Sequence, residues 1–375
     1  MKHTVTFFPV GNGDTSLIEL DNGKWLLMDY FHQDQGEDPT NPIIDLKQTL
    51  TNKLNAARKA AFDVVMFTHA DNDHIRGASD FFFFEHAAKY QGNERPKIEE
   101  LWVPAAFVLE EGLEDHDRVI RQEARHRIRK GKGIKVFSKP EALKQWLSNN
   151  GLSVEDRRAC FVDAGQIVPN FLPSIDGFEL FCHAPFKEQI DDEEEYRNNA
   201  SIILHGSFVF PTASFGYFII GDADFDYLEK VVTRSEENEN ENRLAWDLYF
   251  IPHHCSYKGL SGDKGETETT PTDPIARLLK KGRPQNYMVV SCLAFETLEK
   301  PEDRSLPPHI QAKRCYERYS GATKGRKLFV TMAYPTHKDP KPLVIEITEN
   351  GLAVKDPTPT PILTSSPPRA GSNDN

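Results

Sequence analysis

The segment from residue 68 to 74 carries a dense group of side chains that can bind metal ions. The four potential ligands are His69, Asp71, Asp73 and His74. They come directly after the apolar run 62–67, which is typical of a strand buried on both faces. Ligands bind at the carboxyl ends of strands in open α/β sheets, and mixed imidazole and carboxylate groups suit Zn²⁺, Mn²⁺ or iron. The alternative is a polar turn in which Asn72 or Asp73 caps the next helix. The close spacing of four such residues favours the metal site.

Two further apolar runs also end in potential ligands. The run 217–220 is followed by Asp222, and the run 248–251 is followed by His253 and His254. Three strand ends with ligands of the same kind predict one composite site. Neighbouring residues of an extended chain point to opposite sides, so we expect only one of the two histidines to bind metal. We prefer His254 as the ligand, which leaves His253 near the leaving group or substrate, and the reverse assignment stays open.

The elements that must position these residues alternate between strands and helices, which predicts an α/β domain with two substantial sheets. Strands are expected at 3–10, 15–20, 24–30, 62–69, 98–104, 134–137, 178–185, 201–206, 217–222, 248–254, 287–292, 327–332 and 342–347. Helices are expected at 42–59, 77–89, 117–130 and 141–149. We expect one domain over residues 1–355, with insertions near 110–150 and 235–275, and a disordered Pro/Ser-rich tail at 356–375.

The segments around the potential ligands resemble the metallo-β-lactamase fold. They are most similar to the soluble relatives of the hydrolase domain of the competence protein ComEC. In chain order, the matching segments are 10–15, 26–29, 69–74, 198–204, 219–224, 251–256 and 289–291. Each match is weak alone, but their order and spacing together are specific. The resemblance implies a four-layer αββα sandwich with two mixed β-sheets and a metal site at one edge of both.

The resemblance also implies how the ligands are shared. His69 and Asp71 would hold one metal ion. Asp73, His74 and one histidine of the pair at 253 and 254 would hold a second, and Asp222 would bridge both. The expected cofactor is Zn²⁺, as one or two ions. Mn²⁺ or Mg²⁺ is also tolerable, because Asp71 stands where the broader fold has a histidine. Asp73 would orient a water molecule whose pKa is lowered by the metal.

Other positions matched by the resemblance are expected to contact the substrate or to support the ligands. They are Asp14, Asp29, Asn198, Asn199, Ser201, Ser256 and His309. The broader fold supplies a further histidine where this chain has residues 197–201. The first metal position would therefore be weakly held, empty, or completed by Asn199 and water. Cys255 replaces a glycine, and we favour packing over metal ligation for its thiol.

These residues together predict a metal-dependent hydrolase that uses a metal-activated water on a phosphodiester, in nucleic acid or a nucleotide. The alternatives are hydrolysis of a carboxylic ester, thioester or lactam, and a partner or scaffold protein with a partly degraded metal site. The net charge of −12 counts against coating nucleic acid by bulk electrostatics. A basic segment at 118–139 offers possible anion-binding residues, although a solvated helix face is the alternative. These residues are Arg118, Arg121, Arg125 and Arg129.

Composition places the protein among soluble globular chains. Hydrophobic residues make up 38% and charged residues 27% of the sequence. No apolar run approaches the roughly 20 residues of a membrane helix, and the N-terminus does not resemble a signal peptide. We therefore expect a cytoplasmic protein that does not associate with membranes. The five cysteines are scattered, which predicts ordinary thiols rather than disulfides.

Overall fold

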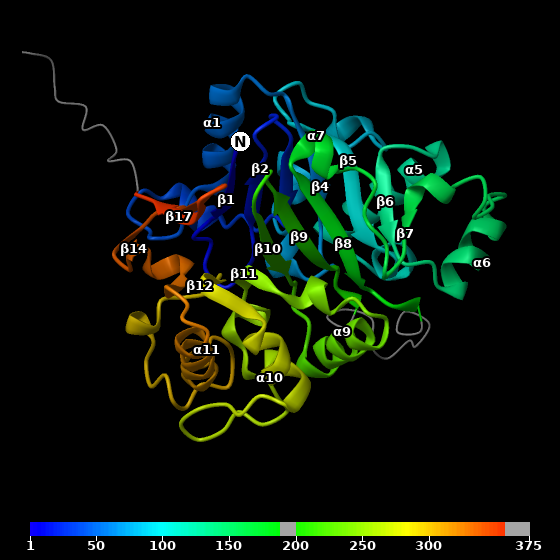
Figure 1. The fold of residues 1–375 in the computed structure, drawn as a ribbon. Helices are drawn as coiled ribbons and strands as arrows, with labels where there is room; N and C mark the ends of the chain where they lie inside the picture. Colours follow the sequence, from blue (N-terminus) through cyan, green and yellow to red (C-terminus); the bar gives the residue numbers. More distant parts are fainter. Residues whose placement is uncertain (188–199, 357–375) are drawn as a thin grey trace, which may run out of the picture.

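The computed structural model describes residues 1–187 and 200–356. Two β-sheets pack face to face, and helices cover the outer face of each (Figure 1). The first sheet has nine strands in the order β17-β16-β1-β2-β3-β4-β5-β6-β7, and the second has six in the order β13-β12-β11-β10-β9-β8. The predicted α/β fold class, a four-layer αββα sandwich, is confirmed.

The nine-stranded sheet is mixed. Its strands are β1 (Lys2–Phe7), β2 (Ser16–Glu19), β3 (Trp25–Met28), β4 (Ala61–Met66), β5 (Lys97–Pro104), β6 (Ile134–Phe137), β7 (Phe161–Val162), β16 (Leu343–Thr348) and β17 (Gly351–Lys355). The strands from β3 to β7 run parallel to one another, whereas β1, β2, β16 and β17 pair antiparallel. The carboxyl ends of β3 and β4 therefore lie side by side.

The six-stranded sheet is mixed in the same way. Its strands are β8 (Phe178–Ala184), β9 (Ile203–Val209), β10 (Ser214–Ile219), β11 (Trp246–Phe250), β12 (Gly282–Val290) and β13 (Lys327–Val330). β8, β9 and β10 pair antiparallel, and β10 to β13 run parallel. This brings the carboxyl ends of β10 and β11 together. A separate short hairpin is formed by β14 (Pro335–Thr336) and β15 (Asp339–Pro340).

Helices form the two outer layers. The first sheet carries α1 (Leu46–Ala57), α4 (Ala105–Leu109), α5 (Asp115–Lys130) and α6 (Glu141–Asn149), and the second carries α9 (Phe225–Glu237), α10 (Asp273–Lys280) and α11 (Ile310–Ala322) (Figure 1). Each long helix buries one apolar stripe. In α1, the buried residues Leu46, Leu50 and Leu54 recur every four positions, which is the spacing of one helix face.

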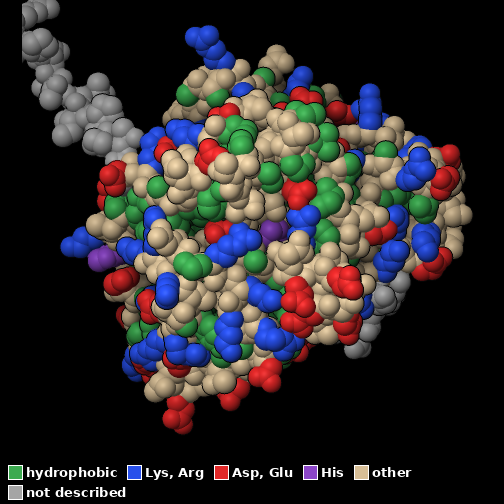
Figure 2. All heavy atoms as spheres, in the orientation of Figure 1, with side chains coloured by type: hydrophobic (Ala, Val, Ile, Leu, Met, Phe, Trp, Pro, Cys, Tyr) green, Lys and Arg blue, Asp and Glu red, His purple; other side chains and the backbone are tan. Residues whose placement is uncertain are grey.

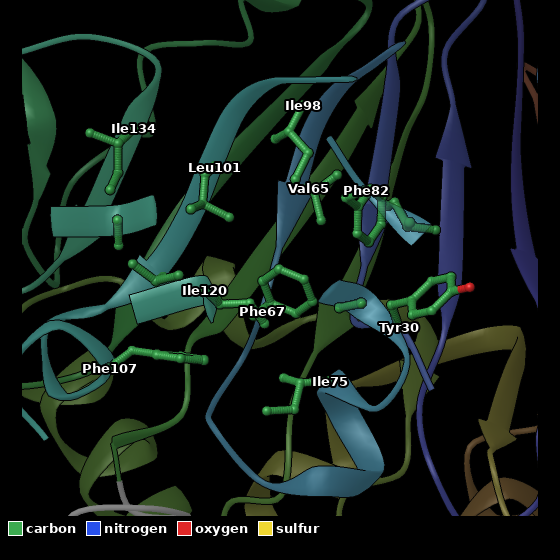
Figure 3. Packing of buried hydrophobic residues seen from close by; sticks show 14 of the residues in the cluster. Tyr30, Val65, Phe67, Ile75, Phe82, Ile98, Leu101, Phe107, Ile120 and Ile134 are labelled. Carbon is green, nitrogen blue, oxygen red and sulfur yellow. The ribbon is translucent and has the colours of Figure 1, made fainter. Parts of the chain in front are cut away.

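Three hydrophobic clusters separate the four layers. One lies between the first sheet and its helices and includes Leu50, Leu101 and Ile120 (Figure 3). A second lies between the sheets, and a third lies between the second sheet and its helices. In this layered arrangement each central strand is covered on both faces. The continuous apolar run of β4 suits such a position.

The helix expected at 77–89 is wrong. After the single-turn helix α2 (Asn72–Ile75), the chain there forms one more single-turn helix, α3 (Ala78–Phe81), and then a non-helical stretch that leads to a 3₁₀ turn at Ala88–Tyr90. The cause is the run of four phenylalanines at 81–84, because one helix face cannot bury them together. Phe82 has extended backbone, and Phe81, Phe82 and Phe84 are all buried in the first cluster.

The second half also contains elements that the sequence did not reveal. Helices α9, α10 and α11 and strand β17 were not expected there, and neither was the short strand β7 in the first half. Residues Ser235–Glu237, at the start of the expected insertion near 235–275, complete α9. The tail predicted at 356–375 lies outside the described residues apart from Asp356. No helix within the described ranges combines the length and apolar character needed to cross a membrane.

Candidate metal centre

The potential ligands lie where the carboxyl ends of four strands meet. His69–His74 follows β4, Asp29 follows β3, Asp222 follows β10, and the histidine pair follows β11. The two sheets converge at this edge, and the backbone amide of Asp14 donates to the Asp73 carbonyl at 3.0 Å. Segments far apart in the chain thus form one site.

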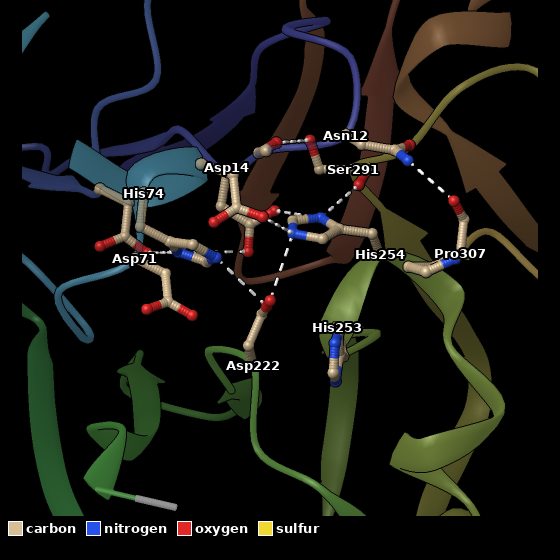
Figure 4. A network of polar contacts seen from close by, with 12 residues as sticks. Asn12, Asp14, Asp71, His74, Asp222, His253, His254, Ser291 and Pro307 are labelled. Carbon is tan, nitrogen blue, oxygen red and sulfur yellow. Dashed lines mark hydrogen bonds and ion pairs between the residues drawn. The ribbon is translucent and has the colours of Figure 1, made fainter. Parts of the chain in front are cut away.

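Four residues form the centre of this site, and Figure 4 labels three of them, His74, Asp222 and His254. The four are Asp73, His74, Asp222 and His254, and one ligand atom from each lies within 4.8 Å of every other. Nε2 of His254 lies 3.2 Å from Asp73 Oδ2 and 3.3 Å from Asp222 Oδ2. Nε2 of His74 lies 3.2 Å from Asp222 Oδ1. Two imidazoles and two carboxylates therefore converge on one point, with all but Asp73 fully buried.

A second group adjoins the first. It consists of His69, Asp71 and Asp73, whose ligand atoms also lie within 4.8 Å of one another. Asp73 belongs to both groups, whereas Asp222 belongs only to the first. Asp73 is thus common to the two groups, and the expectation that Asp222 bridges two metal ions stays a prediction. The ring centroids of His69 and His74 are 4.0 Å apart, so the two groups are in direct contact.

Asp29 and Ser291 orient the two central histidines. Asp29 has a left-handed backbone (φ 54°), and its carboxylate accepts from His74 Nδ1 at 2.7 Å. It also accepts from the amide and the hydroxyl of Thr68, both at 2.7 Å. Nδ1 of His254 donates to the Ser291 carbonyl at 3.0 Å. In both histidines Nδ1 is thus occupied, and Nε2 is the atom turned toward the carboxylates.

The electrostatics of the centre match a cation site. Burial would raise the pKa of Asp222, but the charges of His254 and His74 hold it well below the usual range. Burial would lower the pKa values of both histidines, but the neighbouring carboxylates raise them well above the usual range. Burial raises the pKa of Asp14, which lies 3.5 Å from His254 Nδ1, to about 7. A buried excess of carboxylates attracts positive charge.

Unpaired buried atoms test whether these residues fit a metal ion. Within the described part of the chain, His69 Nε2, His74 Nε2 and Asp222 Oδ1 are buried and have no hydrogen bond of acceptable geometry. Such groups are costly unless something binds them. A divalent cation satisfies imidazole nitrogens and carboxylate oxygens together, so the donor set fits a metal.

The side chains of His253 and His254 point to different places, as expected, but the expected cause, an extended backbone, was wrong. The chain is not extended there. His253, His254 and Cys255 form a 3₁₀ turn with φ values of 52°, 49° and 64°. His253 turns away from the central group and places Nδ1 3.1 Å from Asp224 Oδ1 (Figure 4). The Cys255 side chain is fully buried in the third hydrophobic cluster, which agrees with packing.

The remaining supporting residues lie in different surroundings. Ser201 is buried beside Gly221, where a Cβ on the glycine would lie 3.4 Å from the Ser201 Cβ. Ser256 accepts from the Lys258 amide and so caps the next turn. His309 is buried, stacks edge-on against Tyr257, and has its pKa lowered by burial. Asn198 and Asn199 lie outside the described residues.

The predicted anion-binding arginines are mostly engaged within the protein. Arg121 and Arg125 both pair with Glu111, and Arg129 donates to Asn150 and lies over the Trp146 ring. Arg118 is exposed. Arg121, Arg125 and Arg129 thus contact neighbouring segments, and anion binding by this helix face stays a prediction.

Three supporting residues were not singled out from the sequence. Thr68 bridges Asp29 to the ligand loop, Ser291 orients His254, and Asp224 holds His253. The signal for two of them was present, because Asp224 and Ser291 end segments that match the resemblance. Thr68 had no signal beyond its place beside His69.

Comparisons with known proteins add little. No protein-family model matches the sequence, and no curated protein matches it. One similar solved structure is described as a new diphosphatase from the PhnP family, with 11% identity and a TM-score of 0.34, covering 92% of this chain and 98% of that one. Another is the class B3 di-zinc metallo-β-lactamase LRA-12 from an Alaskan soil metagenome, with 11% identity and a TM-score of 0.27, covering 85% and 91%. Neither similarity supports the functional proposal, which depends on the site alone.

Proposed function

We propose that the protein is a metal-dependent hydrolase whose substrate is a phosphodiester. The observation that carries the proposal is the convergence of Asp73, His74, Asp222 and His254 from three strand ends, with buried ligand atoms that lack hydrogen bonds. A site of this composition suits Zn²⁺, and Mn²⁺ is an alternative. Metal ions bound there would lower the pKa of a water molecule and polarise the bond to be cleaved.

Residues of the protein would position the water, the substrate and the ligand histidines. Asp73 is the most exposed of the four central residues, with 36% of its side chain accessible, so it can meet the water and the substrate. The carboxylate of Asp224 accepts from His253 Nδ1 and leaves Nε2 to contact the substrate. Asp29 and Ser291 keep the ligand histidines in their orientation.

An anionic substrate is supported by the side chains beside the site. Lys258 is exposed and follows His254 by only four residues. Lys264 and Arg304 lie close enough to His309 to lower its pKa, after burial itself. Figure 2 shows a histidine at the surface in the middle of one face, with both Lys or Arg and Asp or Glu side chains near it. Lysine and arginine side chains near the site would attract a phosphate more than a neutral ester.

The test is a substrate panel with metal analysis. The purified protein should contain at least one transition-metal ion per chain and should hydrolyse bis-para-nitrophenyl phosphate faster than a thioester, a carboxylic ester or a lactam. Asp222→Ala should lose both metal and activity. Preferred cleavage of a thioester, ester or lactam would assign the alternative hydrolase. A metal-free protein without activity on any of them would assign the scaffold role.

Variants of the two adjacent histidines distinguish the metal ligand from the residue that contacts the substrate. We expect His254→Ala to lower the metal content, because Nε2 of His254 faces both carboxylates. We expect His253→Ala to keep the metal and to lower the turnover rate. Metal analysis and steady-state rates on the same preparations measure both. If His253→Ala loses the metal while His254→Ala keeps it, the assignment must be reversed.

A further inference from the structure

A cavity of about 390 Å³ adjoins the metal-binding loop, and none of the candidate ligands lines it. Arg76 and Gly77, which directly follow the loop, form one part of the wall, and Tyr30 and His32 form another. The backbone amide of His32 donates to the Arg76 carbonyl at 3.0 Å, which holds the two parts together. The volume is within the range of small-molecule sites.

Two buried polar atoms of this wall have no partner. Among the described residues, neither the Tyr30 hydroxyl nor His32 Nδ1 makes a hydrogen bond, although the side chains are 0% and 6% exposed. The Tyr30 hydroxyl points away from the packed cluster of the first layer (Figure 3). The two rings have centroids 6.4 Å apart. Native proteins rarely leave such groups unsatisfied, so a polar group bound beside them would be stabilised.

Gly77 allows these two side chains to approach each other. A Cβ at this position would lie 3.0 Å from the His32 Cβ and 3.3 Å from Tyr30 Cε1. Gly77 also has a φ of 83°, which disfavours other residues. A glycine at this position thus lets the His32 and Tyr30 side chains pack closely against the backbone that follows the ligand loop.

The chemistry of this part of the cavity favours a donor-rich group. Nε2 of His32 lies 3.5 Å from Glu37 Oε1, and Nδ1 is the ring nitrogen without a partner. With the ring proton on Nε2, Nδ1 is an acceptor. The Asp80 carboxylate lines the same cavity and lies close enough to Tyr30 to act on its hydroxyl. Two acceptors and a hydroxyl suit an ammonium group, which has three donors to share.

The cavity wall also carries positively charged side chains. Lys47 and Arg76 both line the cavity. The contact from Arg76 to Asp34 is 3.8 Å long and both side chains are exposed, so it is weak and can be displaced. These two cations suit a phosphate or a carboxylate.

We propose that this cavity binds a small zwitterion, with its ammonium group at Tyr30, His32 and Asp80 and its anionic group at Lys47 and Arg76. This goes beyond the hydrolase function, because the cavity shares no residue with the metal centre. A divalent cation is a poorer occupant, because the carboxylates and histidines of the cavity do not form a group of converging ligand atoms.

The experiment is isothermal titration calorimetry with O-phosphoethanolamine on protein freed of metal by a chelator, so that its phosphate has no metal to bind. We expect inorganic phosphate and ethanolamine, which each carry one half of the probe, to bind at least about tenfold more weakly than the whole. Tyr30→Phe, which removes only the hydroxyl, should weaken binding roughly fivefold. Lys47→Met should weaken binding to a similar degree or more.

The control is Tyr249→Phe, which removes another buried hydroxyl without a hydrogen bond at a position that does not line the cavity. Its affinity should equal that of the natural protein. The proposal is overturned if the probe does not bind, which would mean that solvent fills the cavity, or if either half binds as tightly as the whole. It is also overturned if Tyr30→Phe and Lys47→Met leave the affinity unchanged. None of these outcomes depends on hydrolase activity.

Discussion

Replacing Asp29 by asparagine tests how the protein prepares His74 for a metal. The carboxylate Oδ1 accepts from the Thr68 amide, and Oδ2 accepts from the Thr68 hydroxyl and His74 Nδ1, all at 2.7 Å. Asparagine has one acceptor oxygen, and its NH₂ group can only donate. If that oxygen stays on the Thr68 amide, the NH₂ group faces His74 Nδ1.

The imidazole must then carry its proton on the other nitrogen. Nε2 is the atom that faces Asp222 at 3.2 Å, and a protonated Nε2 cannot bind a metal. Removing such a supporting carboxylate lowers metal affinity about 10- to 100-fold, which corresponds to about 1.4–2.7 kcal/mol. We therefore expect Asp29→Asn to fold and to bind Zn²⁺ within this range more weakly.

The assay is a zinc titration against a chromophoric chelator, with circular dichroism to check the fold. Asp176→Asn is the matched control, because this carboxylate is equally buried (2% exposed) and also accepts from a backbone amide, that of Leu172 at 2.7 Å. It belongs to none of the ligand groups. A zinc affinity of Asp29→Asn within twofold of the natural protein, or an equal loss in Asp176→Asn, would refute the reasoning.

Two further predictions concern packing and pH. In Gly221→Ala the new Cβ would lie 2.9 Å from Thr68 Cβ and Oγ1, so we expect a loss of about 1–3 kcal/mol in unfolding free energy and weaker zinc binding; an unchanged thermal midpoint would contradict this. For Glu123, burial would raise the pKa, but the hydrogen bonds from His86 and Arg127 lower it from 4.5 to about 2. The ionised Glu123 therefore adds to the free energy of unfolding above pH 4.5, and this stabilisation is lost as the pH falls through 2. Glu123→Gln should lower the free energy of unfolding by about 3 kcal/mol at pH 7 and by progressively less below pH 4.5. Urea unfolding across this pH range measures the difference, and a constant difference down to pH 2 would argue against it.

The strand ends of the site could be predicted because they depend on local patterns. The apolar run before His69 indicated a buried strand, and Asp222 and His254 follow strands of the same kind. Which ligand atoms lie within reach of one another could not be predicted, because that depends on how closely the two sheets approach. Asp73 supplies ligand atoms to both groups, and the Asp14 amide, from the same sheet, donates to its carbonyl.

The fold was predictable to the level of its layers. Alternation of strands and helices and the matched segments gave the four-layer sandwich, but the phenylalanine run after Gly77 was mistaken for a helix because apolar content outweighed its poor helical spacing. The left-handed backbone at His253 and His254 had no sequence signal, since residues other than glycine rarely adopt it. Such positions are set by tertiary contacts.

The most direct test of the metal centre is a crystal structure of the protein grown with Zn²⁺, with anomalous scattering measured at the zinc edge. The account predicts an anomalous peak about 2.0–2.2 Å from Nε2 of both His74 and His254 and from a carboxylate oxygen of Asp222. A fully occupied zinc bound elsewhere, or no peak among these atoms at saturating Zn²⁺, would contradict it.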